Sequence, residues 1–267
     1  MNLISVALSV LSGSGPAKSE ENDRRGLLIA LGILTNWAVS LTVLFRLDVA
    51  QVAPGWIALA MIWQVFTYTG LFITAHDAMH GVVCRNPRLN RFIGTIALLV
   101  YALLPYEKLR AAHWEHHHHP ASDLDPDFHD GQHSQFPQWY LRFMWNYRSG
   151  WSLLGLIAIY HLLHRLLHIP EQNLLLFWVI PSPLSSLQLF FFGTYLPHRR
   201  PQNGYQEPDR AQSLYFPVFW SLLSCYHFGY HREHHENPQA PWWKLPTIAR
   251  SNRGTLPRFL PEFLRLK

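Results

Sequence analysis

Apolar residues gather in four long blocks that form two pairs, and a short connection joins the two blocks of each pair. Leu27–Leu44 and Val52–Ala75 contain no charged residue, and Trp151–Leu167 and Leu174–Leu196 form a second pair of blocks. A helix needs about 20 apolar residues to cross a hydrocarbon core of about 30 Å. The pattern therefore predicts an all-α integral membrane protein with four transmembrane helices, arranged as two antiparallel hairpins.

Two further apolar segments are weaker candidates for membrane spans. Phe92–Tyr106 is short for a span, and Leu214–Tyr230 contains Pro217, which removes a backbone donor inside the segment. We expect both segments to lie at the membrane interface or to be buried inside the protein.

The basic residues indicate how the predicted helices are oriented. With the N-terminus inside, the outer connections contain only Arg46 and Arg165 of the 22 Lys and Arg residues. This asymmetry follows the positive-inside rule, because cytoplasmic loops carry an excess of Lys and Arg. We expect a multi-pass membrane protein whose histidine-rich cap faces the cytoplasm.

The chain divides into three parts by composition. We expect residues 1–25 to form an N-terminal cytoplasmic tail, because this segment lacks the positive n-region of a secretory signal peptide. Residues 26–245 form the membrane domain, and residues 246–267 form a C-terminal cytoplasmic segment. Five prolines between positions 238 and 261 predict that the end of the chain is irregular.

Composition narrows the class of protein further. Only 15% of the residues are charged and 49% are hydrophobic, whereas soluble domains carry about 25% charged residues. The net charge of +5 favours anionic lipid or an acidic partner. Nucleic acid is not an expected partner, since no basic run is interleaved with aromatic residues. The two cysteines, Cys84 and Cys225, are expected to be free thiols.

Many of the 17 histidines are concentrated in three boxes with helical spacing. One box is H-x-x-x-H and two are H-x-x-H-H, and residues three or four apart lie on the same face of a helix. The boxes therefore predict eight imidazoles that converge at the boundary between membrane and cytoplasm. They comprise His76 and His80; His113, His116 and His117; and His231, His234 and His235.

Eight imidazoles indicate a site for more than one metal ion. Zinc sites use three or four protein ligands, so eight suit two ions with open positions, although imidazole alone does not select the metal. The zinc-protease motif H-E-x-x-H does not fit, because Asp77, Trp114 and Arg232 follow the first histidines of the boxes. A metal transporter is an alternative, but its ligands would lie near mid-bilayer rather than at the ends of spans.

The boxes and the sequences around them resemble the superfamily of integral-membrane fatty-acid desaturases and hydroxylases. Within it, the chain is similar to bacterial carotenoid ketolases, the β-carotene 4-ketolases. The matching pieces are AHDAMHG at 75–81, HWEHHHHP at 113–120, DLDPDFHDG at 123–131, FFGTYLPHR at 191–199 and YHFGYHREHHENP at 226–238. The resemblance covers about residues 26–245, which it identifies as a desaturase-like oxygenase domain.

The resemblance implies a di-iron centre on the cytoplasmic side that activates O2. It adds a ninth ligand, His198, to the eight histidines of the boxes. Desaturases have an asparagine four residues before this histidine, where this chain has Thr194, so Thr194 is left out of the ligand set. Asp77 and Asp125 are the favoured carboxylates for orienting the ligand imidazoles, because they flank the boxes in family-like motifs.

The resemblance also implies the reaction. A keto group would be introduced at C4 of the β-ionone ring of β-carotene by two successive hydroxylations and loss of water, giving echinenone and canthaxanthin. The carotenoid would enter from the bilayer. Electrons would come from an external donor such as reduced ferredoxin, because the chain has no G-x-G-x-x-G motif. A carotenoid ring hydroxylase and a fatty-acid desaturase are alternatives on the same frame.

Several other histidines are not expected to bind the metals. His161, His164 and His168 share a helix face near the outer end of the third predicted span, a membrane thickness away from the boxes. Helical spacing turns His118 and His119 off the face that carries the second box.

Overall fold

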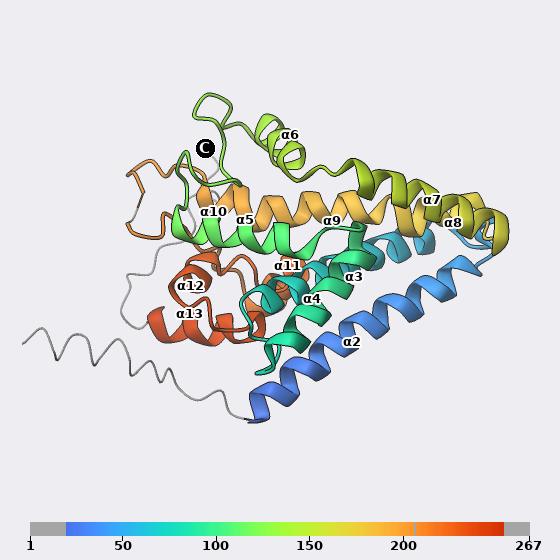
Figure 1. The fold of residues 1–267 in the computed structure, drawn as a ribbon, viewed down its shortest axis with the longest axis horizontal. Coiled ribbons are helices and arrows are strands. Elements are labelled where there is room, and N and C mark those ends of the chain that lie inside the picture. The colour runs from blue at the N-terminus through green and yellow to red at the C-terminus, as the bar shows by residue number, and fades with distance from the viewer. Residues whose placement is uncertain (1–19, 206, 254–267) are drawn as a thin grey trace, which may run out of the picture.

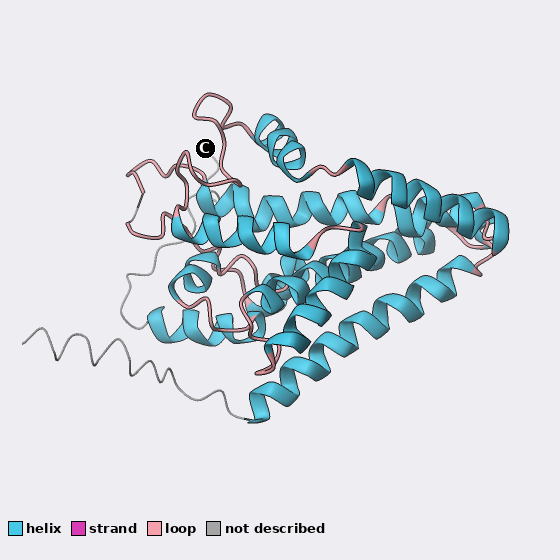
Figure 2. Ribbon diagram, viewed as in Figure 1, coloured by secondary structure: helices cyan, strands magenta, loops and turns pink. Residues whose placement is uncertain are grey.

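Every regular element in the described part of the chain is a helix. The computed structural model describes residues 20–205 and 207–253, and Figure 2 shows helices and loops throughout this part. The all-α prediction is therefore confirmed for these residues. Residues 1–19, which hold most of the predicted N-terminal tail, lie outside the described residues.

The first two long helices form an antiparallel pair (Figure 1). α2 spans Glu20–Phe45 and α3 spans Pro54–Met79, with the short 3-10 turn Val49–Gln51 between them. α2 begins inside the predicted tail of residues 1–25, so the helix extends further toward the N-terminus than the sequence indicates.

The environment of α3 changes along its length. Its first half carries exposed apolar side chains such as Trp56, whose exposed fraction is 69%, whereas the residues from Thr67 to Met79 are almost all buried. Ala75 and Ala78 pack in one apolar core with Ala97 of the following helix. The buried half of α3 therefore carries the first histidine box into the interior of the protein.

Two shorter helices meet at a sharp bend. α4 spans Pro87–Ala102 and α5 spans Tyr106–His118, and the two helices are bent by 102° relative to each other. Leu103 lies at the bend with a left-handed backbone, at φ +52°, and caps α4. The segment Phe92–Tyr106, which we expected at the interface or in the interior, ends in this bend with one face of α4 buried.

The second half of the chain contains another pair of helical arms. α6 spans Phe136–Tyr147 and α7 spans Gly150–Leu166, after which the chain returns along α7's side as a helical run that ends at His198 (Figure 1). The run consists of α8 (Glu171–Leu174), a π-helical segment (Leu175–Val179), α9 (Pro181–Phe190), a second π-helical segment (Phe191–Tyr195) and α10 (Leu196–His198). π-Helical turns occur frequently at functional sites, and the second one directly precedes α10.

The C-terminal part is more helical than the sequence predicts. It contains α11 (Val218–Cys225), α12 (His231–Glu236), the 3-10 segment Trp242–Lys244 and α13 (Leu245–Arg253). The expectation of an irregular end is wrong for α13, because Leu245 and Ala249 lie one turn apart and pack against Tyr230. Residues 254–267 lie outside the described residues.

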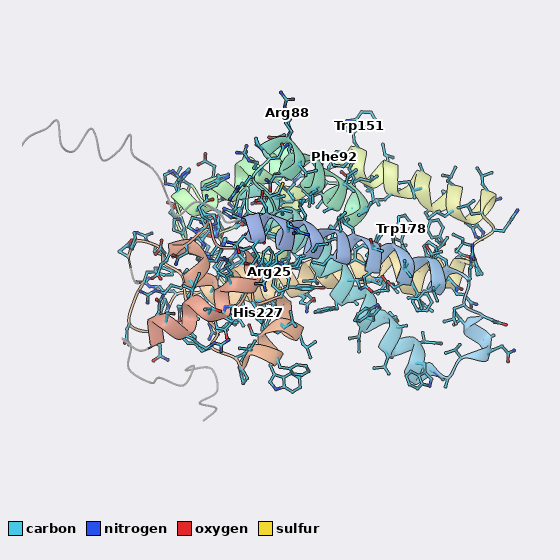
Figure 3. All side chains as sticks on the ribbon, turned by 90° about the horizontal axis from the view of Figure 1, so that it is seen from below. Arg25, Arg88, Phe92, Trp151, Trp178 and His227 are labelled. Carbon is cyan, nitrogen blue, oxygen red and sulfur yellow. The ribbon has the colours of Figure 1, made fainter. Side chains whose placement is uncertain are left out.

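Among the described residues, three helices are long and apolar enough to cross a membrane. They are Glu21–Phe45, Pro54–Met79 and Glu171–His198, and the bent pair of α4 and α5 would make a fourth span. α7, the third predicted span, has 17 residues and a length of about 25 Å, which is less than a hydrocarbon core of about 30 Å. Its surface is still apolar: Trp151 is 86% exposed and points away from the protein in Figure 3. Such helices are typical of a membrane protein.

Candidate metal centre

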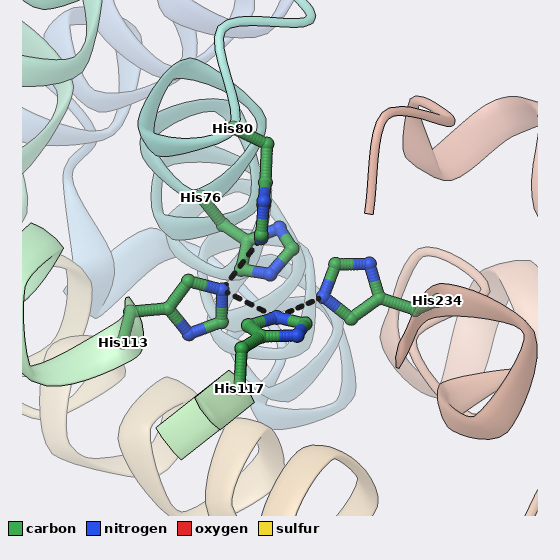
Figure 4. Close-up of side chains that lie close together, drawn as sticks. All are labelled: His76, His80, His113, His117 and His234. Atoms are coloured by element: carbon green, nitrogen blue, oxygen red, sulfur yellow. Dashed lines mark hydrogen bonds between the residues drawn. The ribbon is translucent and has the colours of Figure 1, made fainter. Parts of the chain in front are cut away.

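The structure brings together all nine histidines that were predicted as metal ligands. They form two clusters, and in each cluster one nitrogen of every histidine lies within 4.8 Å of the others. The five-histidine cluster comprises His76, His80, His113, His117 and His234 (Figure 4). The four-histidine cluster comprises His116, His198, His231 and His235.

Most of the cluster histidines lie at the ends of helices. His76 lies in the last turn of α3 and His80 caps that helix, while Gly81, at φ +66°, ends it. Glycine takes this left-handed backbone without steric cost, so Gly81 stops α3 directly after the first histidine box. His198 is the last residue of α10, and the six other cluster histidines lie on α5 and α12.

Neighbouring residues on α5 and α12 belong to different clusters. His116 and His117 divide between the four- and five-histidine clusters, and so do His235 and His234. Adjacent residues on a helix point about 100° apart, so one turn can supply both clusters. The spacing of the boxes predicts that the histidines converge, but it does not predict this division.

In the five-histidine cluster, the Nε2 atoms of four rings lie close together. Nε2 of His113 is 2.7 Å from Nε2 of His80 and 3.2 Å from Nε2 of His117, as the dashed lines in Figure 4 mark. The Nε2 atoms of His117 and His234 are 3.0 Å apart. The ring of His76 lies 4.5 Å from the ring of His113, centroid to centroid, so the five side chains surround one centre.

The four-histidine cluster has the same character. Nε2 of His235 lies 3.2 Å from Nε2 of His116 and 3.1 Å from Nε2 of His231. The ring centroid of His198 is 4.7 Å from that of His116 and 4.8 Å from that of His231. All four side chains are buried, so the described residues shield this cluster from water.

The spacing of these nitrogens fits a metal ion in each cluster. Two imidazole nitrogens that bind one ion at about 2.0–2.1 Å and at right angles are about 2.9 Å apart. The observed Nε2–Nε2 distances are 2.7–3.2 Å. Both ring nitrogens of His76 and Nε2 of His198 are buried without a hydrogen-bond partner. Unpaired buried polar atoms cost free energy, and an ion at each centre would bind one ring nitrogen of His76 and Nε2 of His198.

The protonation states also suit metal binding. Burial lowers the pKa values of His231, His234 and His235 well below the ordinary imidazole value, and the neighbouring imidazoles lower them further. The three rings of α12 are therefore neutral at pH 7. Neutral imidazole is the form that binds a metal ion, so protons do not compete for these nitrogens near neutrality.

Asp125, predicted from the sequence as an orienting carboxylate, contacts a cluster histidine directly. Its carboxylate accepts from the Nδ1–H of His116 at 2.9 Å and from the backbone N–H groups of Ala121 and Asp127 at 2.9 and 2.8 Å. Burial alone would raise the pKa of Asp125, but the adjacent His116 outweighs burial and the pKa lies below its ordinary value. The contact fixes the tautomer of His116 and leaves Nε2 for the cluster centre.

Asp77, the second predicted carboxylate, has a different position. Its Oδ1 lies 3.7 Å from Nδ1 of His76, beyond hydrogen-bond distance, and its Oδ2 accepts from the backbone N–H of Trp242 at 3.3 Å. Asp77 therefore joins the end of α3 to the C-terminal segment. Glu233, between the histidines of the third box, bonds instead to the hydroxyl groups of Ser213 and Tyr215.

Two contacts of the clusters have no signal in the sequence motifs. The Nδ1–H of His198 donates to the backbone carbonyl of Arg210 at 3.1 Å. Every residue type has a backbone carbonyl, so the sequence does not indicate this acceptor. Phe228 packs its ring edge-on against His76 and His231, with centroid distances of 4.7 and 5.3 Å. Its aromatic character was visible in the sequence, but its position between the clusters depends on the fold.

The other eight histidines belong to neither cluster. His118 and His119 are exposed at the end of α5, and His133 bonds to Asp130 in the following loop. His164 lies near the end of α7, where its Nδ1–H donates to the carbonyl of Ile169 at 3.0 Å. The structure therefore separates these histidines from the clusters.

The chain matches known proteins over most of its length. The profile of the fatty acid desaturase family matches residues 50–167 and 145–266, a range that includes every cluster histidine. A β-carotene 4-ketolase of Protosiphon botryoides is 38% identical over 259 residues, which cover 89% of this chain and 66% of the relative. A β-carotene 4-ketolase 3 of Haematococcus lacustris is 39% identical over 270 residues, which cover 90% of this chain and 84% of the relative.

A third relative has a similar degree of likeness. A β-carotene ketolase of Paracoccus sp. is 39% identical over 225 residues, which cover 83% of this chain and 90% of the relative. Membership of the desaturase family suggests that the metal of the two clusters is iron. The family resemblance seen in the sequence is confirmed: the chain belongs to the fatty acid desaturase family and, within it, to the β-carotene ketolases.

Proposed function

We propose that this chain is a β-carotene 4-ketolase, which converts C4 of a β-ionone ring to a ketone with O2 as co-substrate. The observation that carries the proposal is the presence of two adjacent histidine clusters in a chain whose relatives are named β-carotene ketolases. Two clusters of imidazole nitrogens suit two metal ions, and the family supports iron.

The nine cluster histidines would hold the irons, five around one ion and four around the other. When bound, the two irons would supply the activation of O2 that the reaction requires. The remaining tasks belong to the chain. Asp125 keeps the Nε2 atom of His116 directed at the four-histidine cluster, and Phe228 packs between the clusters, where it helps to exclude water. Asp77 would orient His76 through the end of α3 rather than by a direct hydrogen bond.

Two successive hydroxylations account for the product. In each one, one oxygen atom of O2 enters a C–H bond of ring carbon 4 and the other leaves as water, which consumes two electrons and two protons. The second hydroxylation gives a geminal diol, and loss of water from the diol leaves the ketone. A carotenoid with one ketolated ring is echinenone, and one with two is canthaxanthin.

We infer that α2, α3, α7 and the helical run Glu171–His198 cross the membrane as two hairpins, with the clusters in a cytoplasmic cap. The turns of both helix pairs lie at one end of the molecule, whereas α5, α10 and α12 converge toward the other, which supports this arrangement (Figure 1). Local thinning of the bilayer accommodates a helix as short as α7. An apolar carotenoid would then reach the clusters from the bilayer.

We propose that the electrons come from a separate acidic carrier such as reduced ferredoxin. The chain has 22 basic and 17 acidic residues, so an acidic protein would be attracted to it. Turnover by the purified protein with reduced ferredoxin should fall as ionic strength rises. Turnover that is independent of salt would contradict electrostatic docking.

Expression in a β-carotene-producing bacterium, followed by chromatography of the pigments, tests the activity. The unaltered chain should give echinenone and canthaxanthin, while a His234→Ala variant should give neither, although the protein still reaches the membrane. Accumulation of only 3-hydroxylated pigment would reject the ketolase in favour of a ring hydroxylase. Unchanged carotenoids together with newly unsaturated fatty acids would favour the desaturase alternative.

A further inference from the structure

The segment between α10 and α11 lies beside the four-histidine cluster, and its residue Arg210 contacts the imidazole of a cluster histidine. The backbone N–H of Gln212 donates to the carbonyl of Pro197 at 3.0 Å, so this segment runs along the end of α10. Arg210 presents its own carbonyl to the Nδ1–H of His198 at 3.1 Å. Arg210 therefore connects the segment to the imidazole of His198, while Tyr205 of the same segment donates from its hydroxyl to the backbone carbonyl of His198 at 3.0 Å.

Arg210 has an unusual backbone conformation for a residue with a side chain. Its φ angle is +43°, in the left-handed region that favours glycine. This conformation turns the Arg210 carbonyl toward His198. It is held by the guanidinium group, whose Nε–H donates to Glu207 at 2.9 Å and whose Nη1–H donates to the carbonyl of Ala121 at 3.2 Å.

The contact with Ala121 extends the connection to a second cluster histidine. Ala121 also has a left-handed backbone, at φ +50°, and its N–H donates to the carboxylate of Asp125 at 2.9 Å. That carboxylate accepts from the Nδ1–H of His116. The path from His198 through Arg210, Ala121 and Asp125 thus ends at His116, whose ring centroid lies 4.7 Å from that of His198.

We propose that Arg210 is a positioning residue that fixes the orientation of His198 and His116 together, and thereby sets iron occupancy of the four-histidine cluster. The proposal rests on the proposed di-iron function. Both imidazoles donate their outer hydrogen bond to groups on this one path, and both belong to the same cluster. Loss of the guanidinium group should therefore affect one iron and leave the five-histidine cluster intact.

The choice of arginine follows from the donors that the path needs. Guanidinium carries five N–H donors in a planar fork, so it can bond to Glu207 and to the Ala121 carbonyl at the same time. Lysine retains the charge but concentrates its donors at one nitrogen, and it should restore the path only in part. Glycine favours the left-handed backbone but removes both side-chain bonds.

Three variants with one control separate these contributions. Arg210→Ala, Arg210→Lys and Arg210→Gly are purified from membranes of cells grown with iron-57, beside the exposed control Arg200→Ala. For each protein, iron per chain, the Mössbauer spectrum and the thermal unfolding midpoint are measured. None of these measurements depends on turnover.

Arg210→Ala and Arg210→Gly should fall from two irons per chain toward one, with loss of one of two Mössbauer signals and little change of the unfolding midpoint. Arg210→Lys should lie between these variants and the unaltered protein, and Arg200→Ala should match the unaltered protein. Two intact signals in Arg210→Ala would overturn the proposal. Equal loss of both signals with a lower unfolding midpoint would also overturn it, since that result indicates a general structural role.

The glycine variant distinguishes the side chain from the backbone. If Arg210→Gly matched the unaltered protein while Arg210→Ala lost iron, the backbone conformation alone would position His198, and the role of the guanidinium group would be refuted. An unaltered protein that binds two irons but forms no ketone would refute the proposed function while leaving the inference about Arg210 standing. An unaltered protein that binds no iron would refute both.

Discussion

The substitution Asp125→Asn tests how far a carboxylate outside the cluster controls metal binding. Asp125 accepts three hydrogen bonds, from the Nδ1–H of His116 and from the backbone N–H groups of Ala121 and Asp127, and it is buried. Asparagine has nearly the same shape but only one acceptor oxygen, so its NH2 group must face one of these three donors. The substitution also replaces the ionised carboxylate that accepts from His116 with a neutral amide.

The size of the effect follows from these contacts. A hydrogen bond to a charged group contributes about 1.5–3 kcal/mol, and about 1.4 kcal/mol corresponds to a tenfold change in an equilibrium constant. Asp125→Asn should therefore weaken iron binding in the four-histidine cluster by about 10- to 150-fold. Because the pKa of Asp125 lies below its ordinary value, the carboxylate stays ionised near neutral pH. The difference in iron affinity between the variant and the unaltered protein should therefore not vary between about pH 6 and 8.

Competition with a chelator measures this affinity directly. The purified variant and the unaltered protein are titrated with a chelator of known iron affinity, and bound iron is counted after separation. Asp123→Asn is the matched control, because Asp123 lies two residues away and is exposed. Iron affinity in Asp125→Asn equal to that of the control would refute the assignment of Asp125 as the residue that orients His116.

Three further predictions follow from other parts of the molecule. His116→Ala should abolish ketone formation and lower bound iron, whereas His164→Ala, at the far end of α7, should retain most activity in the same pigment assay; equal losses would contradict the separation of the two sites. The histidines of α12 stay neutral in the folded protein, because their pKa values lie well below the ordinary value. In the unfolded chain the same imidazoles bind protons near pH 6.5, so acidification favours unfolding. Lowering the pH from 7.5 to 5.5 should therefore reduce the free energy of unfolding of the metal-free protein by about 1.4 kcal/mol for each of these histidines. Thermal unfolding of the chelator-treated protein at both pH values checks this, and a midpoint that does not fall on acidification would contradict it. Gly94→Ala should lower stability by about 1–3 kcal/mol because a Cβ would overlap the Tyr106 ring, whereas Gly32→Ala has open space and should not; equal unfolding midpoints would refute this packing.

The helical histidine boxes could be predicted from the sequence because their geometry is local. Spacings of three and four residues bring side chains together on any helix, and α3, α5 and α12 have this form. The long helices could be predicted for a similar reason, since an uncharged run such as Val52–Ala75 has few alternatives to a membrane helix.

The features that were missed depend on tertiary contacts. The bend between α4 and α5 occurs at Leu103, a residue type that rarely takes a left-handed cap; Pro105 marks a helix break in the sequence, but it does not predict the direction of the bend. α13 forms in a proline-rich segment because Leu245 and Ala249 pack against Tyr230 in a buried apolar cluster. The carbonyl of Arg210 reaches His198 only because two loops meet.

The division of neighbouring histidines between clusters has a mechanical consequence. His116 and His117 are joined by one peptide bond, as are His234 and His235, and their α-carbons are about 3.8 Å apart. The spacing of the two cluster centres is therefore fixed at two points by covalent backbone rather than by packing. A movement of α5 or α12 therefore displaces ligands of both clusters together, relative to His76 and His80 on α3 and His198 on α10.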